Sequence, residues 1–189
     1  MKVAIYGSAT SIDNFNKDLI KQAKEIGELL AQKNHIIITG ACAGIPFIVA
    51  EAAFKLGGKV IGYSPAINKN DHKKRFNDPI EYFTKMIFIP KNYEYVENKI
   101  ACYKYRNIRT TINCDKAIII GGRSGTLDEF IKSYEFGKEI GVLKNSKGAA
   151  NFIEKDLMES SFVKIYKNTG DRIYFEKSPK KLLKMMKLI

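Results

Sequence analysis

The sequence lacks the long apolar runs that a membrane protein needs. Its longest purely apolar stretches, such as residues 117–120, are only a few residues long, whereas a membrane-spanning helix requires roughly 20 apolar residues. The chain passes directly from Met1 into a strand-like segment that ends at Gly7, without the apolar core and cleavage site of a secretory signal. We therefore expect a cytoplasmic protein that has no membrane partner.

Cysteine and histidine are also scarce. The three cysteines, Cys42, Cys102 and Cys114, are widely spaced and form no CxxC pair, and the chain has only two histidines. A structural zinc site needs four closely spaced ligands of these types, so we expect no metal. We interpret the cysteines as reduced, mostly buried thiols.

Two standard nucleotide-binding motifs are missing. The chain contains neither Gly-x-Gly-x-x-Gly, the fingerprint of dinucleotide-binding folds, nor Gly-Lys-[Ser/Thr], the core of the phosphate-binding P-loop. Hydride transfer and ATP hydrolysis are therefore disfavoured as functions.

Acidic residues are few relative to basic ones. Lysine and arginine number 32 against 20 aspartates and glutamates, which gives a formal net charge of +12. Such a charge favours anionic partners, namely nucleic acid, anionic lipid or a phosphorylated small molecule. Because lysine is spread along the whole chain, a general compositional bias explains the charge better than a nucleic-acid-binding patch. Nucleic acid is thus an unlikely partner.

Strand-like and helix-like segments alternate along the 189 residues, a length that fits one domain over residues 1–189. Apolar, β-branched runs predict strands at 3–6, 35–39, 59–63, 86–89, 116–120, 140–143 and 172–175. Apolar spacings of three and four predict helices at about 15–30, 46–54, 95–113, from 125, 151–158 and 179–188. Residues 64–85 are rich in Asn, Asp, Lys and Pro and predict a long, partly mobile loop. This order predicts an α/β fold with one doubly wound, mostly parallel, Rossmann-like sheet and helices on both faces.

Three glycine turns follow predicted strands. In open α/β sheets, ligands bind beyond the carboxyl ends of the strands, and the N–H groups at a helix start suit phosphate. A single glycine turn is weak evidence, but three at strand ends indicate a phosphate or nucleotide site. The candidate binding residues are Gly7, Ser8, Gly40, Gly44, Gly121, Gly122, Arg123, Ser124, Gly125 and Thr126.

The third glycine turn, residues 121–125, is followed by the side chains most suited to phosphate binding and catalysis. Gly122 and Gly125 would let the backbone approach a phosphate closely, and the Thr126 hydroxyl could donate a hydrogen bond to it. Glu129 lies three residues after Thr126, a spacing that also fits a capping box, in which the glutamate bonds the threonine backbone N–H. Both interpretations of Glu129, helix cap or site residue, are compatible with the sequence.

Two arginines precede this turn. Arg106 and Arg109 are three residues apart and share one face of the predicted helix. They could form an ordinary solvated face, or Arg106 could converge with Arg123 and Glu129 at one strand end. The second arrangement would suit a phosphorylated sugar.

Residues 106–129 resemble the core of the LOG family, whose members were formerly labelled lysine decarboxylases. The family signature places an arginine on a helix, an aspartate before a strand, and then a glycine-rich turn with Gly-Thr-x-x-Glu. Here these positions are occupied by Arg106, Asp115, Gly125, Thr126 and Glu129. The similarity extends over nearly the whole chain. The family includes cytokinin riboside 5'-monophosphate phosphoribohydrolases, and its relatives include molybdenum-cofactor carrier proteins.

The resemblance implies hydrolysis of the N-glycosidic bond of a nucleoside 5'-monophosphate, which releases the free base and ribose 5-phosphate. The phosphate would lie on residues 121–126, Arg106 would orient the ribose phosphate or the base, and Glu129 would stabilise the oxocarbenium charge and position water. Arg106 and Glu129 are thus the implied catalytic residues, with Arg109 as a further binding residue. The family also implies no metal, no redox cofactor and a homodimer.

Three positions depart from the hydrolase pattern. Gly121 stands where the family usually has proline, Arg123 where it has a third glycine, and Asn107 where the hydrolases usually carry lysine. These residues are more similar to the cofactor-carrier branch. The alternative function is therefore a non-catalytic protein that binds a nucleotide or the molybdenum cofactor on the same fold.

Overall fold

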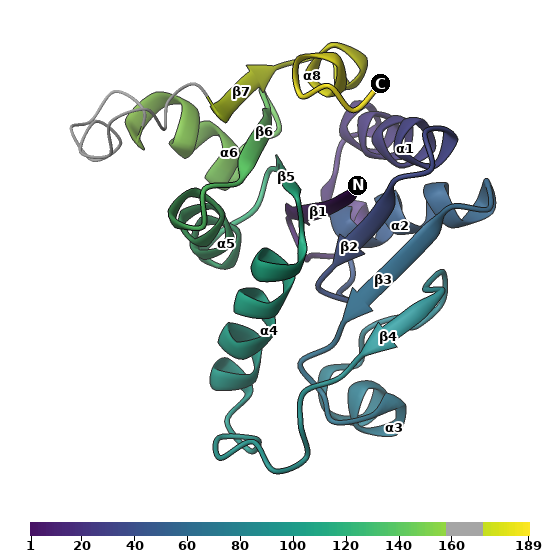
Figure 1. Cartoon of the computed structure of the whole chain (residues 1–189), viewed down its shortest axis with the longest axis vertical. Helices are drawn as coiled ribbons and strands as arrows, with labels where there is room; N and C mark the ends of the chain where they lie inside the picture. Colours follow the sequence, from purple (N-terminus) through teal and green to yellow (C-terminus); the bar gives the residue numbers. More distant parts are fainter. Residues whose placement is uncertain (158–171) are drawn as a thin grey trace.

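A seven-stranded sheet forms the centre of the structure, a computed structural model that describes residues 1–157 and 172–189 (Figure 1). The strands are β1 (Lys2–Gly7), β2 (Ile36–Thr39), β3 (Lys59–Tyr63), β4 (Lys85–Ile87), β5 (Lys116–Ile120), β6 (Glu139–Leu143) and β7 (Ile173–Glu176). They lie in the order β4-β3-β2-β1-β5-β6-β7, and all neighbouring strands in this described sheet are parallel. The predicted doubly wound, Rossmann-like α/β fold is confirmed.

Helices cover both faces of the sheet. They are α1 (Lys17–Gln32), α2 (Ile45–Lys55), α3 (Lys69–Asp71), α4 (Lys99–Asn113), α5 (Ser124–Glu135), α6 (Gly148–Phe152) and α8 (Pro179–Met185). Helices α1, α2 and α8 lie on one face, whereas α4, α5 and α6 lie on the other (Figure 1). Successive side chains of β1 alternate between these two layers: Val3 and Ile5 join the first core cluster, and Ala4 and Tyr6 join the second.

The site lies where the order of the strands reverses. From β1 the chain first builds β2, β3 and β4 on one side, and it then crosses back to place β5 on the other side of β1. The connections after β1 and β5 therefore diverge to opposite faces and leave a crevice beyond the carboxyl ends of these strands. The first and third glycine turns both lie at this crevice.

The segment between β3 and β4 is more ordered than its composition predicts. Asn68 caps the short helix α3 by accepting a hydrogen bond from the backbone N–H of Asp71 at 2.9 Å, and a π-helical turn, His72–Phe76, follows. His72 is fully buried, and its Nδ1 lies 2.8 Å from the Ser64 hydroxyl. The expectation of a long loop over residues 64–85 is wrong for this part, because local polar side chains satisfy the backbone.

Some predicted element ends also shift. Helix α4 begins at Lys99 rather than near residue 95, because the Asn98 side chain caps it by accepting from the Ala101 N–H at 3.1 Å. Helix α6 begins at Gly148, before the predicted start at 151. The predicted end of that helix, at residue 158, lies outside the described residues.

The described part of the chain contains no helix that is both long and apolar enough to cross a membrane. All three cysteines are free: Cys102 and Cys114 are buried, and Cys42 is partly exposed. No group of three or more His, Cys, Asp or Glu side chains in residues 1–157 and 172–189 is arranged to hold a metal ion.

Candidate functional site

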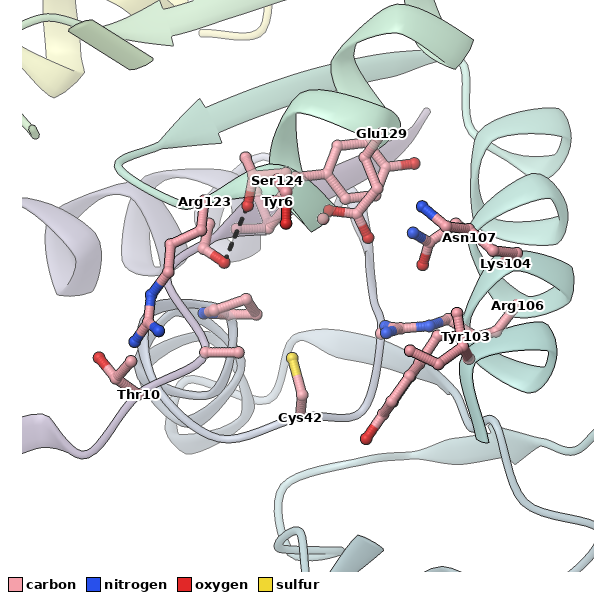
Figure 2. Close-up of a pocket in the computed structure, with 18 residues that line it drawn as sticks. Tyr6, Thr10, Cys42, Tyr103, Lys104, Arg106, Asn107, Arg123, Ser124 and Glu129 are labelled. Carbon is pink, nitrogen blue, oxygen red and sulfur yellow. Dashed lines mark hydrogen bonds between the residues drawn. The ribbon is translucent and has the colours of Figure 1, made fainter. Parts of the chain in front are cut away.

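A cavity of about 520 Å³ lies at the crevice beyond β1 and β5 (Figure 2). Its walls come from the turns after β1 and β2, from α4 and from the start of α5. The lining residues are Ile5, Tyr6, Gly7, Ala9, Thr10, Gly40, Cys42, Pro46, Ile100, Tyr103, Lys104, Arg106, Asn107, Arg123, Ser124, Gly125, Thr126 and Glu129. The volume suits a small-molecule ligand of nucleotide size.

Hydrogen bonds lock the three glycine turns together. Gly7 accepts through its carbonyl from the Thr126 hydroxyl at 3.2 Å, and the Gly122 N–H donates to the Ser8 hydroxyl oxygen at 2.7 Å. The Ile45 N–H donates to the Ser8 carbonyl at 2.9 Å. The first turn thus holds the other two. Because the Thr126 hydroxyl proton is engaged with Gly7, the predicted bond from this hydroxyl to a phosphate would have to replace that contact.

Glycine is required at two of these turns by close approach. A Cβ at Gly40 would lie 1.1 Å from Nη1 of Arg106, so the guanidinium occupies the space that a side chain would fill. A Cβ at Gly44, which has a φ of +82°, would lie 2.2 Å from the Ser8 carbonyl oxygen. In the second turn, Gly40 therefore leaves room for the Arg106 guanidinium, and Gly44 allows close contact with the first turn.

Glu129 points into the cavity from α5 and is only 8% exposed (Figure 2). Burial raises the pKa of its carboxyl from 4.5 to about 7, with Asp128 raising it further and Arg106 opposing the shift. The capping-box interpretation is wrong, because α5 begins at Ser124 with Arg123 as its N-cap residue, so Thr126 is already inside the helix. Glu129 is thus a buried carboxyl with a pKa close to neutral pH.

Arg106 faces Glu129 from α4 across the cavity and is 8% exposed (Figure 2). Its guanidinium carbon lies 5.8 Å from the centre of the Tyr103 ring, and its Nε has no hydrogen-bond partner among the described residues. Burial raises the pKa of the nearby Cys42 thiol to about 11 although Arg106 lowers it. Cys42 is therefore protonated at neutral pH and is not an activated nucleophile.

Arg109 does not reach the cavity, which corrects the expectation that it joins Arg106 in the site. Its Nη1 donates to the Phe88 carbonyl at 2.9 Å, and its guanidinium lies over the rings of Tyr63 and Tyr105 at 5.7 and 5.8 Å. Residues three apart in a helix are turned by about 60° relative to each other. Here that angle is enough to direct Arg106 into the site and Arg109 towards β4.

Four of the predicted glycine-turn residues do not line the main cavity. Ser8 and Gly122 line a smaller cavity of about 270 Å³, whereas Gly44 and Gly121 line neither cavity. The smaller cavity is lined by Ser8, Thr10, Asn14, Phe15, Asn16, Leu19, Gly122, Arg123, Asn145, Ser146, Lys147 and Gly148. The predicted residues that line the main cavity are Gly7, Gly40, Arg106, Arg123, Ser124, Gly125, Thr126 and Glu129.

Sequence reasoning missed a polar cluster that joins α4 to α5. Asn107 Nδ2 donates to Asp128 Oδ2 at 2.9 Å, and Lys104 Nζ lies 3.1 Å from Asp128 Oδ1. Lys132 also pairs with Asp128, and these three donors hold the pKa of the Asp128 carboxyl below its usual range although burial opposes them. The three-residue spacing of Lys104 and Asn107, next to Arg106, was the signal that could have placed them on the cavity wall.

A sequence profile of one family covers almost the entire chain, matching residues 1–183. The chain belongs to the SLOG cluster4 family. This membership agrees with the LOG resemblance carried by Arg106, Asp115, Thr126 and Glu129. An uncharacterised protein of Archaeoglobus fulgidus is 26% identical over 144 residues, which cover 76% of this chain and 80% of that protein.

Solved structures share the SLOG-family fold. The crystal structure of TM1055 has a TM-score of 0.77 at 19% identity and covers 100% of this chain and 99% of its own. The molybdenum cofactor binding protein of Rippkaea orientalis has a TM-score of 0.69 at 18% identity, with 98% and 94% covered. The DNA processing protein A of Helicobacter pylori, described as binding single-stranded DNA, has a TM-score of 0.64 at 16% identity, with 99% and 80% covered. At these identities the likeness shows the fold alone.

Proposed function

We propose that this SLOG-family protein hydrolyses the N-glycosidic bond of a nucleoside 5'-monophosphate to the free base and ribose 5-phosphate. The observation that carries the proposal is the pair of buried side chains, Glu129 and Arg106, that face each other across a cavity floored by glycine turns. A carboxyl with a pKa of about 7 suits proton transfer at neutral pH.

The start of α5 supports the position proposed for the phosphate. Ser124, Gly125 and Thr126 line the cavity and form the first turn of a 12-residue helix, where backbone N–H groups have no partner within the helix. The helix dipole and the Arg123 guanidinium add positive potential at the same end. A 5'-phosphate bound there would place the ribose towards the middle of the cavity, beside Glu129.

The proposed reaction breaks the bond between C1' of the ribose and the base nitrogen. The bonding electrons leave with the base, and the Glu129 carboxylate stabilises the positive charge that develops on the sugar. A water molecule then adds to C1', and its proton passes to Glu129 and finally to the departing base. Arg106 holds the base or the ribose phosphate in place.

Base release from a nucleotide panel tests the proposal. We would incubate the protein with AMP, GMP, CMP, UMP, IMP and N6-prenylated AMP and follow free base by chromatography. Release from at least one nucleotide, reduced at least about a hundredfold in Glu129→Gln, is expected. Glu135→Gln is the matched control, because Glu135 is an exposed glutamate on the same helix. No release, or equal release by both variants, would contradict the proposed role of Glu129.

A second candidate function is binding without turnover. Arg123 occupies a position that is glycine in the LOG pattern, and it places a cationic side chain at the end of the cavity. The fold shared with the Rippkaea orientalis protein, which binds the molybdenum cofactor, favours the same interpretation. Saturable binding of a nucleotide or of the molybdenum cofactor, with no base release, would select this function.

We also propose that the partner is a small phosphorylated molecule rather than nucleic acid. The cationic Arg106 is buried and lines the cavity, a position that suits one small anion better than a polymer backbone along the surface. Binding to single-stranded DNA that falls steeply with salt and ignores base identity would contradict this.

A homodimer is the assembly we propose. Ile108 and Ile112 are 40% and 52% exposed and lie four residues apart along one face of α4. An apolar stripe of this kind is unfavourable in water unless a second surface covers it, and the LOG resemblance implies a second copy of the chain. Light scattering should return twice 21.4 kDa, and Ile108→Lys should lower that mass.

A further inference from the structure

The two cavities adjoin each other at the end of the main cavity that is farthest from Arg106. Thr10 and Arg123 line both cavities, so they form the boundary between them. Figure 2 shows the Arg123 side chain reaching over Thr10, on the opposite side of the cavity from Arg106. A ligand that extends past Arg123 would enter the smaller cavity.

The smaller cavity has the charge of an anion site. Arg123 and Lys147 are its cations, and no aspartate or glutamate lines it. Neither cation forms an ion pair with any residue in the described ranges 1–157 and 172–189. Asn14 and Asn145 add amide groups, which can donate two hydrogen bonds each.

The backbone at this place is already satisfied. The Gly121 N–H donates to the Ser146 hydroxyl oxygen at 2.8 Å, and the Gly122 N–H donates to the Ser8 hydroxyl oxygen at 2.7 Å. These N–H groups are therefore not free to bind a phosphate, in contrast to the first turn of α5. A ligand in the smaller cavity would be held by the side chains of Arg123, Lys147 and the two asparagines.

We propose that the nucleotide site also accepts a second phosphate, so that nucleoside 5'-diphosphates bind more tightly than the monophosphates of the proposed reaction. This inference rests on the proposed nucleotide site and extends it. The first phosphate lies on the first turn of α5, and the second lies beyond Arg123, next to Lys147. Arg123 contacts both phosphates, because a guanidinium presents five N–H donors in one plane.

Paired affinities test the proposal. Isothermal calorimetry on the full-length protein would compare AMP with ADP, GMP with GDP, CMP with CDP and UMP with UDP at one salt concentration. We expect the diphosphate of at least one pair to bind about tenfold more tightly, the size of effect that one charge-assisted contact produces. Lys147→Glu should bring the ratio of the two affinities close to one.

Two further variants test whether the smaller cavity, rather than the net charge of the protein, causes the preference for diphosphates. Lys24→Glu makes the same charge change on an exposed lysine of α1 that lines neither cavity, and it should leave the ratio at its wild-type value. Asn14→Trp fills the smaller cavity without changing charge, and it should lower the ratio as Lys147→Glu does. Thermal unfolding of each variant would confirm that it is folded before its affinities are compared.

The outcomes separate this inference from the proposed function. Equal affinities within every wild-type pair would overturn the inference, and monophosphate cleavage in the same preparation would leave the hydrolase proposal standing. A ratio that Lys147→Glu and Lys24→Glu lower equally would also overturn it, because general electrostatics would then explain the preference. Absence of binding for both series would refute the inference together with the nucleotide site itself.

Discussion

The main cavity has two walls that are built on different principles. The glycine-turn wall comprises the turns after β1, β2 and β5 with the first turn of α5, and backbone contacts such as the Ile45 N–H to the Ser8 carbonyl hold it. The α4 wall comprises Ile100, Tyr103, Lys104, Arg106 and Asn107. Side-chain packing holds this second wall: the ring centres of Tyr103 and Phe76 lie 5.4 Å apart in an edge-on arrangement.

This difference between the two walls predicts which substitutions each wall tolerates. At Gly7 and Gly44 the glycine-turn wall has no room for an added atom, because a Cβ there would lie 2.4 Å from the Ile120 carbonyl oxygen and 2.2 Å from the Ser8 carbonyl oxygen. A wall of packed side chains can adjust its rotamers when one member is replaced. We therefore expect an added atom in the glycine-turn wall to have a larger effect than a change of packing side chain in the α4 wall.

The largest expected effect concerns Glu129, on α5, and is a change in stability with pH. A carboxyl whose pKa is raised on folding stabilises the folded state below its unfolded pKa of 4.5, and this stabilisation is lost as pH rises through about 7. Glu129→Gln removes the charge and should be more stable than the wild type at pH 8, by up to about 3 kcal/mol, at about 1.36 kcal/mol per pKa unit.

Urea unfolding at pH 4 and pH 8 measures this effect. The two proteins should differ little at pH 4, where the wild-type carboxyl is mostly protonated in both states. The exposed Glu135→Gln, on the same helix, should show no comparable difference between the two pH values. A Glu129→Gln variant that is no more stable than the wild type at pH 8 would show that the carboxyl is not buried as described.

The second effect concerns the space beside Gly40 that the Arg106 guanidinium occupies. Gly40→Ala would place a Cβ 1.1 Å from Arg106 Nη1, so the guanidinium must leave its position. We expect base release, or ligand affinity if the protein only binds, to fall about a hundredfold, as when an oriented catalytic donor is lost. Steady-state kinetics or calorimetry on the same nucleotides would measure the fall.

Gly57→Ala is the matched control for that substitution. Gly57 has a φ of +77° and no atom within 4 Å of an added Cβ, far from the cavity lining. Alanine in this left-handed conformation should lower stability by about 1 kcal/mol without lowering activity. If Gly40→Ala lost no more activity than Gly57→Ala, the position of the Arg106 guanidinium beside Gly40 would be unimportant for function.

The third effect tests how the turns are joined. Ser8→Ala removes the hydroxyl that accepts from the Gly122 N–H at 2.7 Å, which leaves a partly buried donor without this partner. The free energy of unfolding should fall by about 1–2 kcal/mol. Ser11→Ala, which removes an exposed hydroxyl bonded to Asp13 at 3.0 Å, should change it by less than about 0.5 kcal/mol. Equal losses would mean that Ser8 does not join the turns.

The smallest effect falls on the α4 wall. Tyr103→Leu removes an aromatic ring from the cavity but keeps an apolar side chain there. Ligand affinity should fall by less than about tenfold, or about 1 kcal/mol, the usual value of one aromatic contact. Tyr105→Leu, whose ring packs on Tyr93 at 4.7 Å and does not line the cavity, should leave affinity unchanged. A larger loss for Tyr103→Leu than for Gly40→Ala would reverse the ranking of the two walls.

The two walls also differ in how well sequence reasoning located them. Gly40, Gly125 and Glu129 could be placed because strand ends, glycine and helix starts obey local geometric rules, and the sheet then brings them together. Arg109 was misplaced because its position depends on which side of α4 faces the Phe88 carbonyl. Lys104, Asn107 and Asp128 form a cluster across two helices, so their pairing depends on packing that spacing along one helix cannot reveal.

The segment between β3 and β4 shows the same limit. Its polar composition predicts a loop, yet His72 is fully buried and bonded to Ser64. The Asp78 carboxylate from this segment accepts from the Ala43 N–H at 3.0 Å, in the second glycine turn. Such long-range side-chain bonds decide whether a polar segment is ordered, and they have no local pattern.

The pairing of β1 with β5 has a consequence for the order in which the molecule assembles. Lys2 and Asp115, whose hydrogen bond at 2.7 Å begins this pairing, are 113 residues apart in the chain. Closing so long a loop is entropically costly and slow, whereas β1 and β2 can pair early across a short connection. The crevice between β1 and β5 therefore comes into being only when both halves of the sheet have met. Ligand binding during refolding should consequently occur later than the first helix formation. A ligand that binds in the crevice would stabilise the pairing of β1 with β5.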